Sequence, residues 1–249
     1  MRLEKFLFLS ILLLSLAGCS TGKKDNENII SANVLYSQGK ELLESRKYSK
    51  AAEEFEKIYF QHPGASITPQ AELMEAYSLY LGTQYEDCVD VLDNFIKIHP
   101  MNLDISYAYY LKGLAEYMQI SRSELDQSIT EKAKVAFDEL ITRFPDTKYA
   151  IDASLKMDLI NDHLAASEMD VGRFYLITNN PISAIGRFQK VIQNYGTTSH
   201  VAEALYRMTE SYLILGIKEE ATKYASVLGY NYNSNKWYKK AYILLSHSK

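Results

Sequence analysis

Small and large apolar residues recur along this chain at a spacing that helices explain. Counted back from a proline, the residue 12 positions earlier is small and the residue 8 positions earlier is large and apolar. The frame fits four stretches: Ala51, Phe55 and Pro63; Cys88, Leu92 and Pro100; Ala133, Phe137 and Pro145; and Ala184 and Phe188, with Gly196 in place of the proline. A small side chain lets two helices approach closely, and proline ends a helix. The pattern predicts an array of helical repeats.

These repeats predict an all-α fold, an α-solenoid of about five helix pairs that resemble tetratricopeptide repeats. We place the pairs at residues 31–66, 67–102, 103–146, 147–197 and 198–229, with a capping helix at 235–246. Thr68 and Pro69 are typical of an N-cap and a first helical residue, and residues 229–235 of a turn-rich break. Since each repeat buries surface against its neighbours, residues 31–246 are expected to form one domain.

Two repeats depart from the regular length. Residues 119–130 are polar and lie between the two helices of the third repeat, where we expect a surface loop. In the fourth repeat, residues 147–178 contain no proline and predict either one helix of about eight turns or two stacked helices. Apolar residues recur in that stretch at Ile151, Leu155, Leu159, Leu164, Met169 and Phe174.

The first 18 residues predict a lipoprotein signal peptide. A short charged segment precedes an apolar stretch that is too short to span a bilayer and is typical of a secretory signal. Leu16, Ala17, Gly18 and Cys19 then resemble a bacterial lipobox, in which the cysteine thiol receives a diacylglyceryl group. An ordinary signal peptide with an unrelated cysteine is the alternative.

Cleavage before Cys19 gives a mature chain that begins with a lipidated cysteine. We expect a diacylglycerol thioether and an N-acyl chain on Cys19, and no other cofactor. Several acyl chains together anchor a protein firmly. Residues 19–30 are expected to form a flexible tether. Ser20, by resemblance to enteric lipoproteins, favours transfer to the outer membrane.

Composition argues against several classes of function. The net charge is −4 and the pI about 5.8, whereas nucleic-acid binding calls for a basic patch. The sequence shows no catalytic grouping, no metal-ligand spacing and no glycine-rich phosphate loop. Cys88 occupies a small-residue position of the repeat, so we interpret it as buried rather than as a nucleophile or ligand. The sequence predicts a binding protein and not an enzyme.

Tyrosine is abundant, with 20 residues in the chain of 249. Tyr36, Tyr77, Tyr80 and Tyr109 are candidates to line a concave face, where aromatic side chains give rigid contact area. Packing in the core is the alternative for each of them. Extended or strand-forming peptides would suit such a face.

Several stretches together resemble the BamD/ComL family of outer-membrane lipoproteins, and its alphaproteobacterial members most closely. They are the lipobox, the repeats, and residues 143–150, 164–175, 184–188 and 197–205. The resemblance covers nearly the whole chain. It implies a non-enzymatic subunit of the machinery that folds and inserts β-barrel proteins, anchored by lipid in the cell outer membrane and facing the periplasm.

The resemblance also implies partners. In the family, C-terminal repeats contact the POTRA domains of a BamA-like barrel subunit, and N-terminal repeats are proposed to receive unfolded outer-membrane proteins. Other lipoproteins of the machinery join the complex. Arg187 matches by position an arginine implicated in the BamA contact, and Glu168 and Asp170 lie in the adjacent matching stretch.

One departure and one alternative remain. Leu125, Asp126 and Gln127 stand where close relatives tend to carry Arg-Asp-Gln, so a role of that arginine does not transfer to this chain. The alternative function is that of another periplasmic repeat lipoprotein, either an adaptor for peptidoglycan enzymes or a pilotin for secretin assembly. Depletion distinguishes them, since only the first function predicts a general loss of barrel proteins.

Overall fold

The computed structural model describes residues 30–120 and 127–247, and the regular structure in these ranges is helical. The eleven helices of this part are α2 (Ala32–Glu44), α3 (Tyr48–Gln61), α4 (Thr68–Leu81), α5 (Tyr85–Ile98), α6 (Ile105–Met118), α7 (Ser128–Arg143), α8 (Lys148–Ile177), α9 (Pro181–Asn194), α10 (Val201–Ile214), α11 (Lys218–Asn231) and α12 (Lys236–His247). No helix among them combines the length and apolarity that a membrane span requires.

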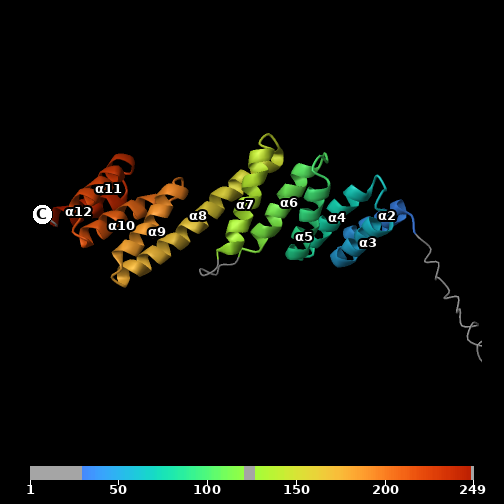
Figure 1. Ribbon diagram of the computed structural model, residues 1–249, viewed down its shortest axis with the longest axis horizontal. Helices are drawn as coiled ribbons and strands as arrows, with labels where there is room; N and C mark the ends of the chain where they lie inside the picture. The colour runs from blue at the N-terminus through green and yellow to red at the C-terminus, as the bar shows by residue number, and fades with distance from the viewer. Residues whose placement is uncertain (1–29, 121–126, 248–249) are drawn as a thin grey trace, which may run out of the picture.

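The helices form an elongated row of pairs (Figure 1). The pairs α2–α3, α4–α5, α6–α7, α8–α9 and α10–α11 follow one another, and each packs against the next. α12 packs against α10 and α11 at the C-terminal end. This architecture confirms the predicted all-α solenoid of five helix pairs with a capping helix. Each predicted repeat range holds one pair, although α11 extends two residues beyond residue 229.

The recurring small and large apolar residues of the sequence pattern form the core. Its small and large residues are all fully buried: Ala51, Cys88, Ala133, Ala184, Phe55, Leu92, Phe137 and Phe188. Burial raises the pKa of the Cys88 thiol to about 12. A thiol that stays protonated is a poor nucleophile and a poor metal ligand. The interpretation of Cys88 as a buried packing residue is confirmed.

Glycines on the first helix of three pairs make room for the phenylalanines of the second helix. A Cβ added to each glycine would come within 3 Å of a ring carbon: Gly39 with Phe55 (2.7 Å), Gly113 with Phe137 (2.5 Å) and Gly172 with Phe188 (2.4 Å). The equivalent positions of the second repeat hold Ala76 and Leu92, which are also fully buried. A larger residue on the first helix is thus matched by a smaller one on the second, which keeps the core close-packed.

Four pairs turn between their helices at an equivalent residue. Arg46, Thr83, Asn179 and Gly216, each two positions before the next helix, have φ between 57° and 77°. In each turn the next amide donates to the carbonyl oxygen five residues earlier: Lys47 to Leu42, Gln84 to Leu79, Asn180 to Tyr175 and Ile217 to Tyr212. This is the hydrogen bond of a Schellman motif. It holds three non-glycine residues in a conformation that glycine adopts most easily.

Two predicted helix boundaries are wrong. Thr68 is the first residue of α4, and Ile67 is the N-cap. The Thr68 hydroxyl instead donates to the carbonyl oxygen of His62 at 2.7 Å, across the preceding turn. α11 continues through Gly229, where an added Cβ would lie 2.7 Å from the Tyr238 ring, so this glycine makes room for α12 and does not end α11.

α8 is one continuous helix of 30 residues, which decides between the two predicted alternatives. Its predicted apolar pattern is only partly its buried face. Leu164 and Met169 are buried, whereas Ile151, Leu155, Leu159 and Phe174 are between 60% and 65% exposed. The buried face also carries Met157 and Ile160, and its other members are small: Ala150, Ala153, Ala165 and Gly172. Small residues allow close helix approach, and a pattern read from the large apolar residues alone therefore marks the contact surface only in part.

The interruption of the third repeat is shorter than predicted. α7 begins at Ser128, so residues 128–130 are helical and not part of a loop, and Thr130 is buried. Residues 121–126 lie outside the described residues. Leu125 and Asp126, which stand where close relatives tend to carry Arg-Asp, belong to that range. Cys19 also lies outside the described residues, because they begin at residue 30.

Candidate functional site

Glu168 joins α8 to α9 through two cations. Its Oε2 accepts a hydrogen bond from Nη1 of Arg187 at 3.0 Å, and its Oε1 accepts one from Nζ of Lys190 at 3.1 Å. Arg187 and Lys190 are three residues apart on α9, so both reach the same carboxylate. The structure therefore brings together two of the three predicted partner-binding residues.

The cations of this cluster lie nearer to solvent than the carboxylate. The side chains of Arg187 and Lys190 are 36% and 52% exposed, and that of Glu168 is 18% exposed. The hydrogen bond to Glu168 is the main cause that raises the pKa of Arg187, so its guanidinium stays charged. Two cations against one carboxylate leave a net positive charge facing outward. Such a surface complements an acidic segment of a partner.

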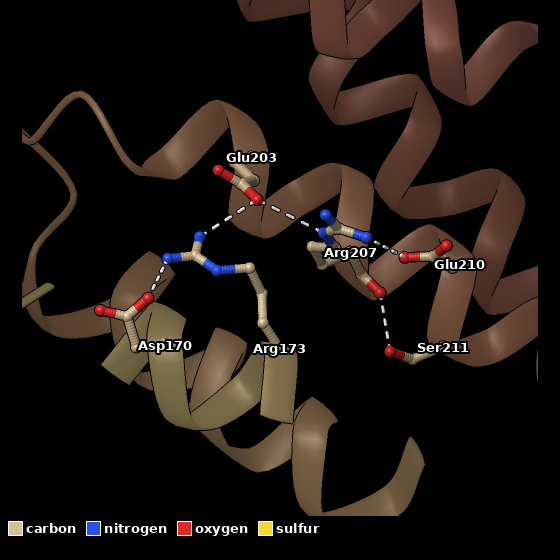
Figure 2. Close-up of polar contacts among 6 residues, drawn as sticks. All are labelled: Asp170, Arg173, Glu203, Arg207, Glu210 and Ser211. Carbon is tan, nitrogen blue, oxygen red and sulfur yellow. Dashed lines mark hydrogen bonds and ion pairs between the residues drawn. The ribbon is translucent and has the colours of Figure 1, made fainter. Parts of the chain in front are cut away.

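Asp170, the third predicted residue, belongs to a separate network (Figure 2). It pairs with Arg173 of the same helix, and Nη1 of Arg173 donates to Oε1 of Glu203 on α10 at 3.2 Å. The same oxygen lies 3.4 Å from Nε of Arg207, whose Nη1 donates to Oε2 of Glu210 at 2.8 Å. This series of alternating charges connects the C-terminal half of α8 to α10.

Arg207 extends the network to the capping helix. Its guanidinium lies 5.4 Å from the Tyr206 ring centroid and 5.7 Å from that of Trp237, and these two rings stack at 5.2 Å. The carbonyl oxygen of Arg207 accepts from Oγ of Ser211 at 2.7 Å (Figure 2). Because Trp237 belongs to α12, the network fixes three helices of the C-terminal end against one another.

Sequence reasoning missed most of this network. Arg173, Glu203, Arg207 and Glu210 were not among the predicted site residues. A signal was present, since Glu203, Arg207 and Glu210 follow one another at spacings of four and three residues, where side chains on one helix face meet. The connection from Arg173 to Glu203 crosses between helices and needs the fold.

Two of the four candidate tyrosines, Tyr36 and Tyr109, pack against phenylalanine rings. Tyr109 is 3% exposed, lies against Phe144 with ring centroids 5.6 Å apart and contacts Arg143 through its hydroxyl. It is therefore a core residue and adds no area to an exposed face. Tyr36 meets the buried Phe55 edge-on at 5.4 Å in the first repeat and keeps an intermediate exposure.

Tyr77 and Tyr80 lie in a half-buried group of tyrosines from neighbouring helices. Ring centroids are 5.8 Å apart for Tyr80 and Tyr85, 5.1 Å for Tyr110 and Tyr149, and 5.5 Å for Tyr107 and Tyr149. Burial raises the pKa of Tyr107 and Tyr110, so both hydroxyls stay protonated. The Tyr110 hydroxyl donates to Oδ2 of Asp152 at 2.6 Å. The group gives the second and third repeats an aromatic surface, and a ligand pocket there stays a prediction.

Comparison with known sequences gives the family. The sequence model of the YfiO family, described as an outer membrane lipoprotein, matches residues 29–228. The chain belongs to the YfiO family. The YfiO match spans α2 to α10 and most of α11, including the Glu168 cluster and the network of Figure 2.

Curated relatives of this YfiO chain include two named outer membrane protein assembly factor BamD. That of Rickettsia prowazekii is 56% identical over 248 residues, which are 99% of each chain. That of Caulobacter vibrioides is 40% identical over 236 residues, 93% of this chain and 77% of the relative. The predicted resemblance to the BamD/ComL family is confirmed. Among solved structures, the TPR2AB domain of yeast Sti1 in complex with pHSP90 aligns with a TM-score of 0.42 at 13% identity, over 87% of this chain and 82% of that chain.

Proposed function

We propose that this chain is a non-enzymatic lipoprotein subunit of the machinery that assembles β-barrel proteins in the outer membrane. One observation carries the proposal: 56% identity over 99% of both chains to a protein named as an outer membrane protein assembly factor. A row of helical repeats supplies an extended binding surface, which suits a scaffold. The relatives' names support this function over the adaptor, the pilotin and an enzyme.

In this proposal the C-terminal repeats hold a BamA-like barrel subunit through its POTRA domains. The outward-facing charge of Arg187 and Lys190 supports a contact with an acidic segment of that subunit. The ion-pair network from Asp170 to Glu210 fixes α8 and α10, so the contact surface beside them is held in place before binding. Less ordering on binding means less entropy lost.

The remaining partners follow from the same function. Other lipoproteins of the machinery join the complex, and the tyrosines of the N-terminal repeats, among them Tyr77 and Tyr80, receive unfolded outer-membrane proteins. Cys19 carries the diacylglyceryl and acyl chains that anchor the protein to the outer membrane with its repeats in the periplasm. Nucleic acid is not a partner, in keeping with the net charge of −4.

Arg187→Glu tests the contact with the barrel subunit. The substitution replaces the guanidinium that faces the partner with a carboxylate, which then lies beside the carboxylate of Glu168. We expect recovery of the barrel subunit to fall at least about tenfold. The measurement is affinity capture of tagged protein from detergent-solubilised envelopes, with the barrel subunit quantified by mass spectrometry. Thermal melting should change little, because Lys190 still pairs with Glu168 and a partly exposed ion pair contributes about 1 kcal/mol.

Lys223→Glu is the matched control. Lys223 lies on α11 and pairs with Glu220 at 3.1 Å on an exposed surface, so its reversal makes a similar local change away from α9. It should leave recovery unchanged. If Arg187→Glu and the wild type recover equal amounts of the barrel subunit, Arg187 is not part of the interface. If the wild type itself recovers no barrel subunit with POTRA domains, the proposed function fails.

A further inference from the structure

An acidic groove crosses the N-terminal repeats between α3 and α5. Both helices pack against α4, which forms the floor. The groove consists of two adjoining pockets of about 320 and about 250 Å³, which share Glu56, Glu75, Asp90 and Val91. It lies apart from the Glu168 cluster, which belongs to α8 and α9.

Acidic side chains line the groove without a lysine or arginine among them in the described part of the chain. Six carboxylates from three helices line the two pockets: Glu53 and Glu56 of α3, Glu72 and Glu75 of α4, and Asp87 and Asp90 of α5. Among the described residues, no lysine or arginine is part of the lining. Like charges gathered on a low-dielectric wall repel one another and attract a cation.

Two of these carboxylates are buried, and one oxygen of Glu72 has no hydrogen-bond partner among the described residues. Glu72 is 3% and Glu75 9% exposed, although both are ionisable. Oε1 of Glu72 lies 3.2 Å from Nε2 of His99, but its buried Oε2 has no hydrogen-bond partner within the described part of the chain. Leaving a buried polar atom unpaired is costly, so a donor that enters the groove would relieve that cost.

The raised pKa of Glu75 agrees with its burial among other carboxylates. Burial is the main cause that raises its pKa to about 8, and the neighbouring carboxylates of Glu56 and Glu72 raise it further. The groups that face Glu75 from the walls are therefore carboxylates. A cation placed among them would favour the ionised form of Glu75 and strengthen its own binding.

Aromatic side chains stand at one end of the groove and indicate which cation fits. Tyr59 and Phe60 line the pocket that contains Glu72, and Phe60 is 69% exposed. A guanidinium group pairs with two carboxylate oxygens at once and stacks on aromatic rings, and it is more weakly hydrated than an ammonium group. A metal ion is not favoured, because no group of three or more His, Cys, Asp or Glu among the described residues could hold one.

We infer that the groove between α3 and α5 is a docking site for an arginine side chain on a segment of a partner polypeptide. The guanidinium donates to the carboxylates of Glu72 and Glu75 and stacks beside Tyr59 and Phe60. Glu53, Glu56, Asp87 and Asp90 give the groove its attraction for basic segments. This site is separate from the contact proposed for Arg187, so either proposal can fail alone.

The test measures binding of a fluorescein-labelled glycine-serine peptide that carries two arginines. Fluorescence anisotropy is recorded with the full-length protein in detergent, at low salt because charge attraction is screened by salt. The matched peptide carries citrulline, which keeps the shape and removes the charge, and a third carries lysine. We expect the arginine peptide to bind at least about tenfold more tightly than the citrulline peptide and more tightly than the lysine peptide.

Paired variants locate the site on the protein. Glu72→Gln combined with Glu75→Gln keeps side-chain volume and should weaken binding of the arginine peptide at least about tenfold. The control, Glu219→Gln combined with Glu220→Gln, makes the same two side-chain changes on α11 and should leave binding unchanged. Circular dichroism of both double variants confirms that they are folded, since neither change leaves a cavity.

Three results would overturn the proposal. Equal binding of arginine and citrulline peptides would mean that charge is not recognised, and equal binding of the lysine peptide would exclude a guanidinium site. The third concerns Lys23 and Lys24 of this chain, which lie shortly before the first described residue, Ile30. If Lys23→Gln combined with Lys24→Gln raises the affinity for the arginine peptide, the chain's own basic segment is the occupant rather than a partner.

Discussion

Cys19→Ala is expected to move the protein from the membrane fraction to the soluble periplasmic fraction. Each acyl CH₂ group buried in a bilayer contributes about 0.8 kcal/mol, so several chains on one cysteine anchor firmly and their loss removes direct binding to the bilayer. None of the described helices is long and apolar enough to cross a membrane in place of the lipid. We expect the membrane-bound share to fall at least about tenfold, with the helical content unchanged.

The variant carries an ordinary secretory signal in place of residues 1–18, so that a failure of lipoprotein processing does not hold it in the membrane. Fractionation after a salt wash, followed by immunoblotting, gives the distribution. Cys88→Ala is the control, because alanine already occupies the equivalent repeat position in three other repeats. It should stay in the membrane. A Cys19→Ala protein that remains in the washed membrane pellet in excess of the barrel subunit it binds would contradict the lipobox assignment.

Glu75→Gln is expected to stabilise the protein at alkaline pH and not at acidic pH. The folded-state pKa of Glu75 is about 8, raised from 4.5 by burial and by neighbouring carboxylates. Below pH 4.5 the group is protonated in both states and adds no penalty. As the pH rises toward 8, the unfolded chain releases this proton and the folded chain keeps it, so stability is lost progressively.

Each pH unit between the two pKa values lowers the free energy of unfolding by about 1.4 kcal/mol. Moving from about pH 5.5 to above pH 8 should therefore destabilise the wild type by on the order of 3 kcal/mol more than the variant. For a chain of this size, that is a difference of about 6–12 °C in melting temperature. Melting followed by circular dichroism at both pH values measures it. Glu219→Gln, on the exposed surface of α11, should follow the wild type. Parallel pH curves for Glu75→Gln and wild type would show that the Glu75 carboxyl is solvated.

The repeat architecture could be predicted because core packing leaves a periodic trace. A fully buried pair such as Ala51 and Phe55 recurs wherever two helices cross, and the spacing alone reveals it. Helix ends were less accurate where a tertiary contact decided them. Gly229, for example, resembles part of a turn in the local sequence, but it lies within α11 and makes room for the Tyr238 ring of α12.

The site residues could be predicted only in part, because they depend on which helices meet. Arg187 and Glu168 were found through the family resemblance, and their contact requires the turn between α8 and α9. Glu72 and Glu75 gave no signal, since two acidic residues one turn apart are typical of a solvated helix face. Their burial follows from α3 and α5 covering both sides of α4, which no local pattern records.

The most direct test of the proposed function is depletion of the protein followed by quantitative proteomics of the outer membrane. If the protein is a subunit of the barrel assembly machinery, barrel proteins as a class should decline together, while lipoproteins of the same membrane persist. Expression of the wild-type chain should restore them. Loss confined to a secretin or to peptidoglycan-linked proteins, with other barrels at normal levels, would contradict the account.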